Sequence, residues 1–445
     1  MLTAPSAARF RQWLLMVLWV VMASAMLVET DAYRYAALAL VCFALIRCRP
    51  YLNLVARDWL ALLCWLWAAY ALIRFIVGVA VYDEPGTSEW LYVFPLFFPG
   101  LGVALYRSRS QIFPAASLLI CLGLAGLLMT IDWGALSRGE RVFPLFHNNP
   151  IHAAIGCGML LITSICWMLH ASESGRCWGW KAIVIPATGW TTVLLSLLGI
   201  LGAQSKGVWL ALLLVAASMV LFLVFSLSRS RLAILVMSAI VAGAAAFAAR
   251  DYVLVVAGPT VEATTRLSTR MLTHDGLLEA IRSTVDDPAT PASMRDRLKL
   301  WANSLHVVWS APWVGWGNLW QREWLRGPYP DVAHRLLHNG YLEILVRHGA
   351  LGALMLGTFV VVSARRVYVA KKNAVIPASI MVYLYGLSLF FFITIASNSN
   401  NRLAIGESFF LLTAAAVFAI SLASRERART ATGSLARPYP AAGAD

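Results

Sequence analysis

Residues 182–227 read AIVIPATGWTTVLLSLLGILGAQSKGVWLALLLVAASMVLFLVFSL. The stretch consists of two apolar runs, each about the length that crosses a bilayer as an α-helix, on either side of a short polar segment. Lys206, in that segment, carries its only formal charge. Because lipid offers the backbone no hydrogen-bond partners, such runs are typical of helices that satisfy their own amides and carbonyls. The stretch therefore predicts two transmembrane helices joined by a tight turn.

The rest of the chain has the same character. Of its 445 residues, 60% are apolar and only 13% are charged, whereas a soluble domain has about half apolar and roughly a quarter charged residues. The seven cysteines are an odd number, lie mostly in apolar runs and lack the CxxC spacing of a metal site. This composition excludes a disordered protein, a secreted disulfide scaffold and an ordinary soluble enzyme. It predicts an all-α polytopic membrane protein.

About twelve segments are long and apolar enough to span a membrane. They are residues 12–28, 33–46, 59–81, 90–106, 112–131, 151–169, 182–203, 207–227, 232–249, 341–363, 374–396 and 404–423. We expect residues 1–249 to hold nine of these helices and residues 341–424 the last three. Residues 250–340 are the only polar segment long enough to fold outside the bilayer, and residues 425–445 have the composition of a disordered tail.

The positions of Lys and Arg indicate how these helices are oriented. Nineteen lie in the termini and loops on the side that holds both chain ends, against five in the short loops of the opposite side. Both termini are therefore expected in the cytoplasm and residues 250–340 on the extracytoplasmic side. The net charge of +14 follows largely from this bias and suits contact with membrane lipids. It gives no reason to expect a nucleic-acid partner.

The extracytoplasmic segment contains an amphipathic helix signal. Thr290 is placed to cap the helix and Pro291 suits its first position. Apolar residues then recur at three- and four-residue steps, at Met294, Leu298, Trp301, Leu305 and Val308. Residues 312–318, rich in Gly, Pro and Trp, end the helix.

Polar groups near lipid are costly and usually functional, and four sets of them fall on the extracytoplasmic side. In the first, from Asp331 to Glu343, His338 is placed to take a proton from a sugar hydroxyl, with Asn339 and Glu343 near it. The second is Lys206, which the short turn holds at the membrane surface, where it can pair with a lipid phosphate. The third and fourth supply further candidates, namely Arg141 and Asn149 before residue 151, and the loop cations Arg266, Arg270, Arg295, Arg297 and Lys299.

Each set also has an ordinary structural interpretation. His338 alone suits an interfacial histidine that bonds a loop, Lys206 a snorkelling anchor, and most of the arginines solvated charges. His334 and His338, at i and i+4, have the spacing of a metal pair, but no third ligand is evident.

Three motifs follow one another within residues 130–360. They are Ser205-Lys206-Gly207 opening a span, Arg297-Leu-Lys-Leu-Trp301 followed by Pro312 and Gly315-Trp-Gly317, and His338-Asn339-Gly340-Tyr341-Leu342-Glu343 followed by Gly349-Ala-Leu-Gly352. This combination resembles the O-antigen ligase and polymerase superfamily, and the Arg141 to Pro150 stretch is similar to that family's Asn-Pro motif before a span. Two positions depart from the family pattern. Lys206 stands where members usually have Arg, and Leu336 where many have a second His.

The resemblance implies an O-antigen ligase of the bacterial inner membrane. Such an enzyme transfers a polymerised glycan from undecaprenyl pyrophosphate to a sugar hydroxyl of lipid A–core oligosaccharide on the periplasmic face. The carried-over roles make His338 the base and place Lys206, Arg141, Arg266 and Arg297 against the pyrophosphate. Further candidate substrate contacts are Arg295, Arg335, Asn339, Glu343 and Asn149. No Asp-x-Asp cluster appears on that face, so we expect an inverting transfer that uses neither a metal nor another cofactor.

Two alternatives stay open. An O-antigen polymerase or a protein O-oligosaccharyltransferase shares the donor chemistry and differs in the acceptor. A lipid-linked glycan transporter or flippase would instead show internal repeats and ionisable residues at mid-span. The sequence has no repeat of fixed period, and the only Lys or Arg residues away from the ends of the predicted spans are Arg74 and Arg347.

Overall fold

The computed structural model describes residues 4–86, 89–224, 250–273, 276–332 and 336–431, together with the single residues Val236, Ile240, Gly243 and Ala244. Within these residues the chain is helical, and the only β-type pairing is an isolated bridge between Val28 and Phe146. The predicted all-α class is therefore confirmed.

The helices up to Val224 are α1 (Ala4–Ala23), η1 (Ser24–Met26), α2 (Ala32–Arg47), α3 (Arg49–Ala56), α4 (Trp59–Tyr82), η2 (Glu89–Leu96), α5 (Phe98–Arg107), η3 (Arg109–Gln111), α6 (Ile112–Thr130), α7 (Trp133–Ser137), α8 (Pro150–Glu173), α9 (Lys181–Gly202) and α10 (Lys206–Val224). Those that follow are α12 (Arg250–Thr273), α13 (Leu277–Asp286), α14 (Ala292–Ser310), η4 (Gly317–Leu319), α15 (Trp320–Trp324), α16 (Gly340–Lys372), α17 (Ala378–Thr394), η5 (Ile395–Ser397), η6 (Asn400–Arg402) and α18 (Ala404–Ala431).

Seven helices of the described part are long and apolar enough to cross a membrane, and nine if two bent pairs each count as one. The seven contain α4, α6, α8, α9, α16, α17 and α18, and the bent pairs are α2 with α3 and η2 with α5. Helices α1 and α10 occupy two further predicted spans, and the predicted span 232–249 lies almost wholly outside the described residues. The protein is thus a multi-pass membrane protein, and the total of twelve spans stays a prediction.

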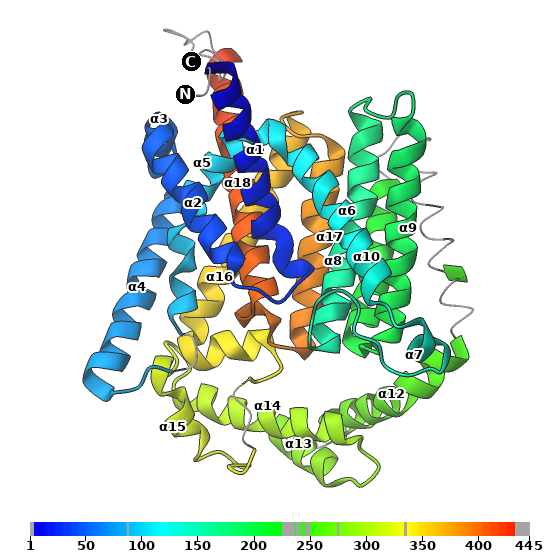
Figure 1. Ribbon diagram of the computed structural model, residues 1–445. Helices are drawn as coiled ribbons and strands as arrows, with labels where there is room; N and C mark the ends of the chain where they lie inside the picture. The colour runs from blue at the N-terminus through cyan, green and yellow to red at the C-terminus, as the bar shows by residue number, and fades with distance from the viewer. Residues whose placement is uncertain are drawn as a thin grey trace.

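The long helices pack as a bundle, and helices α12 to α15 lie together across one end of it (Figure 1). The first turn of α1 and the last turn of α18 lie close together at the opposite end (Figure 1). The segment predicted to fold outside the bilayer is therefore a layer of helices, and the candidate residues that it carries lie at the end of the bundle away from both termini.

The amphipathic helix predicted after Pro291 is α14. Leu298 and Ala302 on one face pack against Ile281 and Val285 of α13. The predicted cap at Thr290 is wrong, because its hydroxyl donates to the carbonyl of Thr284 at 2.7 Å and Pro291 precedes the helix without a side-chain cap. Thr290 is used to close the preceding turn.

Helix α16 is broken inside the predicted span 341–363. Gly349 has φ 56° and ψ −153°, a backbone conformation open to glycine and strained for other residues. The loop from Pro312 to Gly317 fits into the break, where three backbone hydrogen bonds form, Trp316 N to Val346 O at 2.9 Å, Ala350 N to Pro312 O at 2.8 Å and Leu351 N to Trp313 O at 3.0 Å. A side chain at Gly349 would meet the carbonyl oxygen of Pro312 at 2.6 Å. The glycine-rich motifs around 315 and 349 therefore allow two backbones to pack directly.

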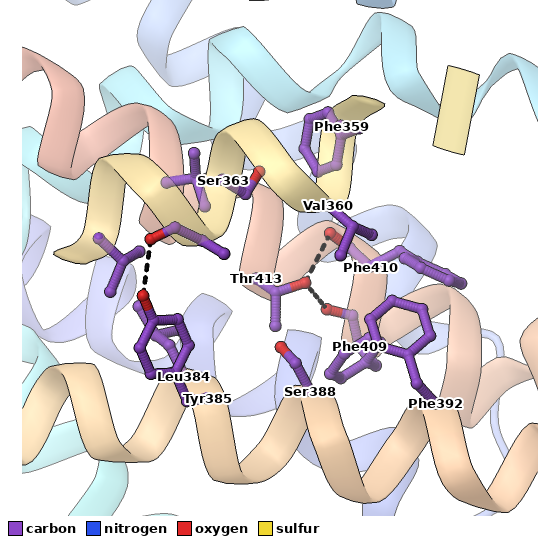
Figure 2. A pocket seen from close by; sticks show the side chains of 13 residues that line it. Phe359, Val360, Ser363, Leu384, Tyr385, Ser388, Phe392, Phe409, Phe410 and Thr413 are labelled. Atoms are coloured by element: carbon purple, nitrogen blue, oxygen red, sulfur yellow. Dashed lines mark hydrogen bonds between the residues drawn. The ribbon is translucent and has the colours of Figure 1, made fainter. Parts of the chain in front are cut away.

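An apolar cavity lies between α16, α17 and α18, lined by aromatic rings that include Phe359, Phe392 and Phe409 (Figure 2). Two polar groups at its wall bond to the backbone, Thr413 to the carbonyl of Phe409 at 2.7 Å and Tyr385 to that of Ala364 at 2.7 Å (Figure 2). None of the predicted site residues lines this cavity.

Candidate functional site

The turn between α9 and α10 fixes the position of Lys206. Gln204 adopts a left-handed conformation, with φ 54°, and this conformation reverses the chain between two antiparallel helices. Lys206 then begins α10, and its Nζ donates a 2.6 Å hydrogen bond to Oγ1 of Thr260 in α12. The lysine predicted from the short turn is thus attached to the helical layer formed by residues 250–324.

Arg141 and Arg297 come from two other elements, and the charges of both act on Lys206. The loop that carries Arg141 lies beside the C-terminal end of α9, where the amide of Val142 donates to the carbonyl of Gly202 at 3.0 Å. Partial burial lowers the pKa of Lys206, and the positive charges of Arg297 and Arg141 lower it further. Burial lowers the pKa of Arg297 as well. The charges of Arg141 and Arg297 therefore disfavour the charged form of Lys206, and an anion bound among these three residues, called the cation cluster below, would offset that effect.

Arg266 and Arg295 have partners in the turn of residues 287–290 instead. Arg266 donates to the carbonyl of Ala289 at 3.2 Å, and Arg295 to that of Thr290 at 3.2 Å. A third arginine, Arg270, lies 2.9 Å from the carboxylate of Asp287. In this arrangement the three guanidinium groups hold a turn, and the predicted pyrophosphate contacts of Arg266 and Arg295 stay predictions.

His338 lies at the entrance to α16 in a left-handed backbone conformation, with φ 49°. Asn339 caps the helix, because its Oδ1 accepts the amides of Tyr341 at 3.0 Å and Leu342 at 3.2 Å. On the other side, the amide of Leu337 donates to Oε1 of Glu343 at 2.8 Å. The half-buried His338 is therefore held between two fixed neighbours. His334 and Arg335 lie outside the described residues.

Asn149 occupies an equivalent position at α8. Its Oδ1 accepts the amide of Ile151 at 2.8 Å, and Pro150 fills the first turn. The Asn-Pro motif therefore has a clear structural use as a helix start. A substrate contact by Asn149 stays a prediction.

The loop of residues 395–403 connects the lysine with the histidine. Ser397 Oγ packs so closely on Gly207, next to Lys206, that any side chain at that position would collide with it. Asn401 Nδ2 donates to the carbonyl of Gly340 at 3.3 Å, two residues after His338. Gly207 and Gly340, 133 positions apart in the sequence, thus lie against the same short loop, and they follow Lys206 and His338 by one and two residues.

The family model described as O-antigen ligase matches residues 191–357. This part of the chain is therefore similar to the O-antigen ligase family. The match includes Lys206, Arg266, Arg297 and His338, and the Arg141 loop lies before it. A search of curated proteins finds no match.

Several residues that bond to groups within residues 191–357 are not among the predicted site residues. Arg402 follows a run of polar residues, Ser397 to Asn401, between two apolar spans, and that run is the signal that could have singled it out. Arg402 donates to Glu343 at 3.1 Å. Glu89 has no motif around it, yet it lies 2.8 Å from Arg347 and is buried. Thr260, the partner of Lys206, carries no charge and has no motif around it.

In the part of the chain that the structure describes, no group of three or more His, Cys, Asp or Glu side chains is arranged to hold a metal ion. The His334–His338 pair cannot be judged from this, because His334 is not among those residues.

Proposed function

We propose that the protein is an O-antigen ligase of a bacterial inner membrane, with both termini in the cytoplasm and the layer of residues 250–340 in the periplasm. Its donor is a glycan on undecaprenyl pyrophosphate, and its acceptor is a sugar hydroxyl of lipid A–core oligosaccharide. Both substrates are anchored in the periplasmic leaflet, so a transferase that joins them has to work at the membrane surface. Twelve spans and the positive-inside bias agree with this placement.

His338 acts as the general base in the proposed reaction. It takes the proton from the acceptor hydroxyl as the hydroxyl oxygen attacks the anomeric carbon of the donor. The bond between that carbon and the pyrophosphate oxygen breaks in the same step, so the configuration inverts. A positioned base contributes about 10²–10⁴-fold to such a proton transfer.

The cation cluster stabilises the departing pyrophosphate. Guanidinium and ammonium groups bind phosphate oxygens strongly, and several of them can neutralise a pyrophosphate without a metal ion. Arg266 is proposed for the same role, which requires it to leave its partner at Ala289. The observation that supports the proposal best is that Lys206 is hydrogen-bonded to α12 and lies near enough to Arg141 and Arg297 for both of their charges to act on it.

Complementation of a strain that lacks its own ligase tests this function. The wild-type chain should restore glycan-capped lipopolysaccharide on a gel, and variants Lys206→Ala and Arg297→Ala should not. Arg138→Gln is the matched control, because Arg138 is exposed, forms its ion pair with the exposed Glu140 and belongs to no proposed site. Longer glycans without capping would favour a polymerase, and glycan attached to protein would favour a protein O-oligosaccharyltransferase.

A further inference from the structure

Four buried charged side chains from three elements form one cluster beside His338. Glu343 and Arg347 lie on α16, Glu89 on η2 and Arg402 on η6, and their exposed fractions are 0, 0, 5 and 6%. Arg347 forms ion pairs with Glu89, at 2.8 Å, and with Glu343. Arg402 lies 3.1 Å from Glu343 and 3.7 Å from Glu89. The four residues are called the buried charge cluster below.

The cluster is balanced in charge and closed in geometry. Two carboxylates face two guanidiniums, so no net charge is left without a partner away from water. Trp320 covers it from the helical layer, with its ring 4.7 Å from the guanidinium carbon of Arg347. Because each of its side chains is almost completely buried, the cluster has no surface to offer to a large glycan acceptor.

Glu343 connects this cluster with the backbone next to His338. Its Oε1 accepts the amide of Leu337 at 2.8 Å and the hydroxyl of Ser399 at 2.7 Å, while Oε2 faces the two arginines. Leu337 is itself fully buried. A residue in a left-handed conformation, as His338 is, keeps it only when its neighbours hold it there.

We propose that Glu343 is a positioning residue for His338, and that Arg402, Arg347 and Glu89 position it in turn. This proposal rests on the proposed role of His338 as the base. Through Glu343 the cluster holds the peptide that leads into His338, and through Arg402 and Ser399 it attaches that peptide to the 395–403 loop. Glu343 itself does not touch the acceptor.

Steady-state kinetics of purified variants test the proposal, with a lipid-linked donor and lipid A–core as acceptor. Arg402→Gln should lower kcat by about 10–100-fold with KM for both substrates within about twofold, because a displaced base slows the proton transfer without loosening substrate binding. Arg402→Lys should recover part of that loss, and Arg138→Gln should match the wild type.

A double variant separates positioning from a general loss of structure. If Arg402 acts through His338, then Arg402→Gln should cause no further loss in a His338→Ala background, since a missing base cannot be misplaced. Losses that multiply in the double variant, or a tenfold rise in KM, would overturn the proposal. Ser399→Ala removes one hydrogen bond to Glu343, and it tests the positioning role if Arg402→Gln does not fold. We expect it to lower kcat about 3–10-fold, and unchanged kcat in this variant would likewise count against the proposal.

The same measurements distinguish failure of the positioning role from failure of the proposed function. Full turnover by His338→Ala would show that His338 is not the base, and the proposed reaction would be rejected. An inactive His338→Ala beside a fully active Arg402→Gln would leave the base in place and reject the positioning role alone.

Discussion

The ammonium group of Lys206 donates a 2.6 Å hydrogen bond to the hydroxyl of Thr260, 54 residues further along the chain. Thr260 lies on α12, the first helix of the layer that crosses the end of the bundle. The contact therefore joins a residue at the mouth of a predicted span to the helical layer that carries Arg297.

Lys206→Ala should lower the rate of glycan transfer by at least about 10²-fold, because it removes a cation aimed at the leaving pyrophosphate. Lys206→Arg should stay within about tenfold of the wild type, since the charge is kept. Thr260→Val removes the hydrogen bond and keeps the ammonium group, so its effect should be smaller than that of Lys206→Ala. Initial rates with purified donor and acceptor measure all three. Equal losses of transfer rate in Lys206→Ala and Lys206→Arg would indicate that Lys206 acts through its packing and that its charge is not required.

His338→Ala should lower transfer by about 10²–10⁴-fold while the protein still folds and inserts. His334→Ala, one helical turn away in the sequence, is the matched control and should have a mild effect. The measurement is turnover per mole of purified monodisperse protein, so that a lower yield is not mistaken for lost catalysis. Wild-type turnover by purified His338→Ala would contradict its role as the base.

Chelation should leave activity within about twofold of its value in untreated protein. The expectation follows from a reaction in which Lys and Arg supply the positive charge opposite the pyrophosphate. Transfer rates before and after EDTA treatment test it. Activity that is lost in EDTA and restored by a divalent cation would favour the His334–His338 metal site.

Cysteine labelling tests the orientation. In a background without the native cysteines, Ala292→Cys at the start of α14 should react with a membrane-impermeant thiol reagent in intact spheroplasts. Thr432→Cys should react only after the membrane is opened. The opposite pattern would move every proposed site residue to the cytoplasmic side.

The turn of residues 287–290 should loosen in acid. The amide of Ala289, and then the guanidinium groups of Arg270 and Arg266, hold the pKa of Asp287 below its ordinary value. A carboxyl with a lowered pKa in the folded state adds stability above its unfolded pKa of about 3.9, and this is lost as the pH falls through the folded value. Hydrogen exchange of residues 283–295, corrected for the intrinsic rate, should therefore rise below about pH 4.

Asp287→Asn provides the comparison for that experiment. It should exchange faster than the wild type at neutral pH and show little further change in acid. Identical protection of the two proteins at pH 7 would mean that the Asp287 charge does not stabilise the turn.

The membrane helices could be predicted because their signal is local. The predicted spans 59–81 and 182–203 agree with α4 and α9 within a residue or two, since the length of an apolar run limits where a helix can start and end. The break of α16 at Gly349 could not be predicted in this way. It depends on hydrogen bonds supplied by the loop at Pro312, and nothing within residues 340–372 reveals that partner.

The sequence predicted several residues of the candidate site, but it did not predict which residues they contact. Motifs pointed to Lys206 and His338, but the packing of their neighbours Gly207 and Gly340 on the 395–403 loop depends on tertiary structure. The sequence gives Arg402 no role, because its partners Glu343 and Glu89 lie 59 and more than 300 residues away. The pairing of buried charges is decided by which helices meet, and periodicity within one segment does not contain that information.

The insertion of residues 312–317 into the break of α16 joins α14 rigidly to the first part of α16. Arg297 lies on α14, which ends at Ser310, and three backbone hydrogen bonds then tie the chain to residues 346–351, just beyond His338. A shift of α14 during substrate entry would be passed on to the start of α16. The distance between Arg297, proposed to contact the leaving group, and His338, the proposed base, would then stay constant, whatever the length of the glycan.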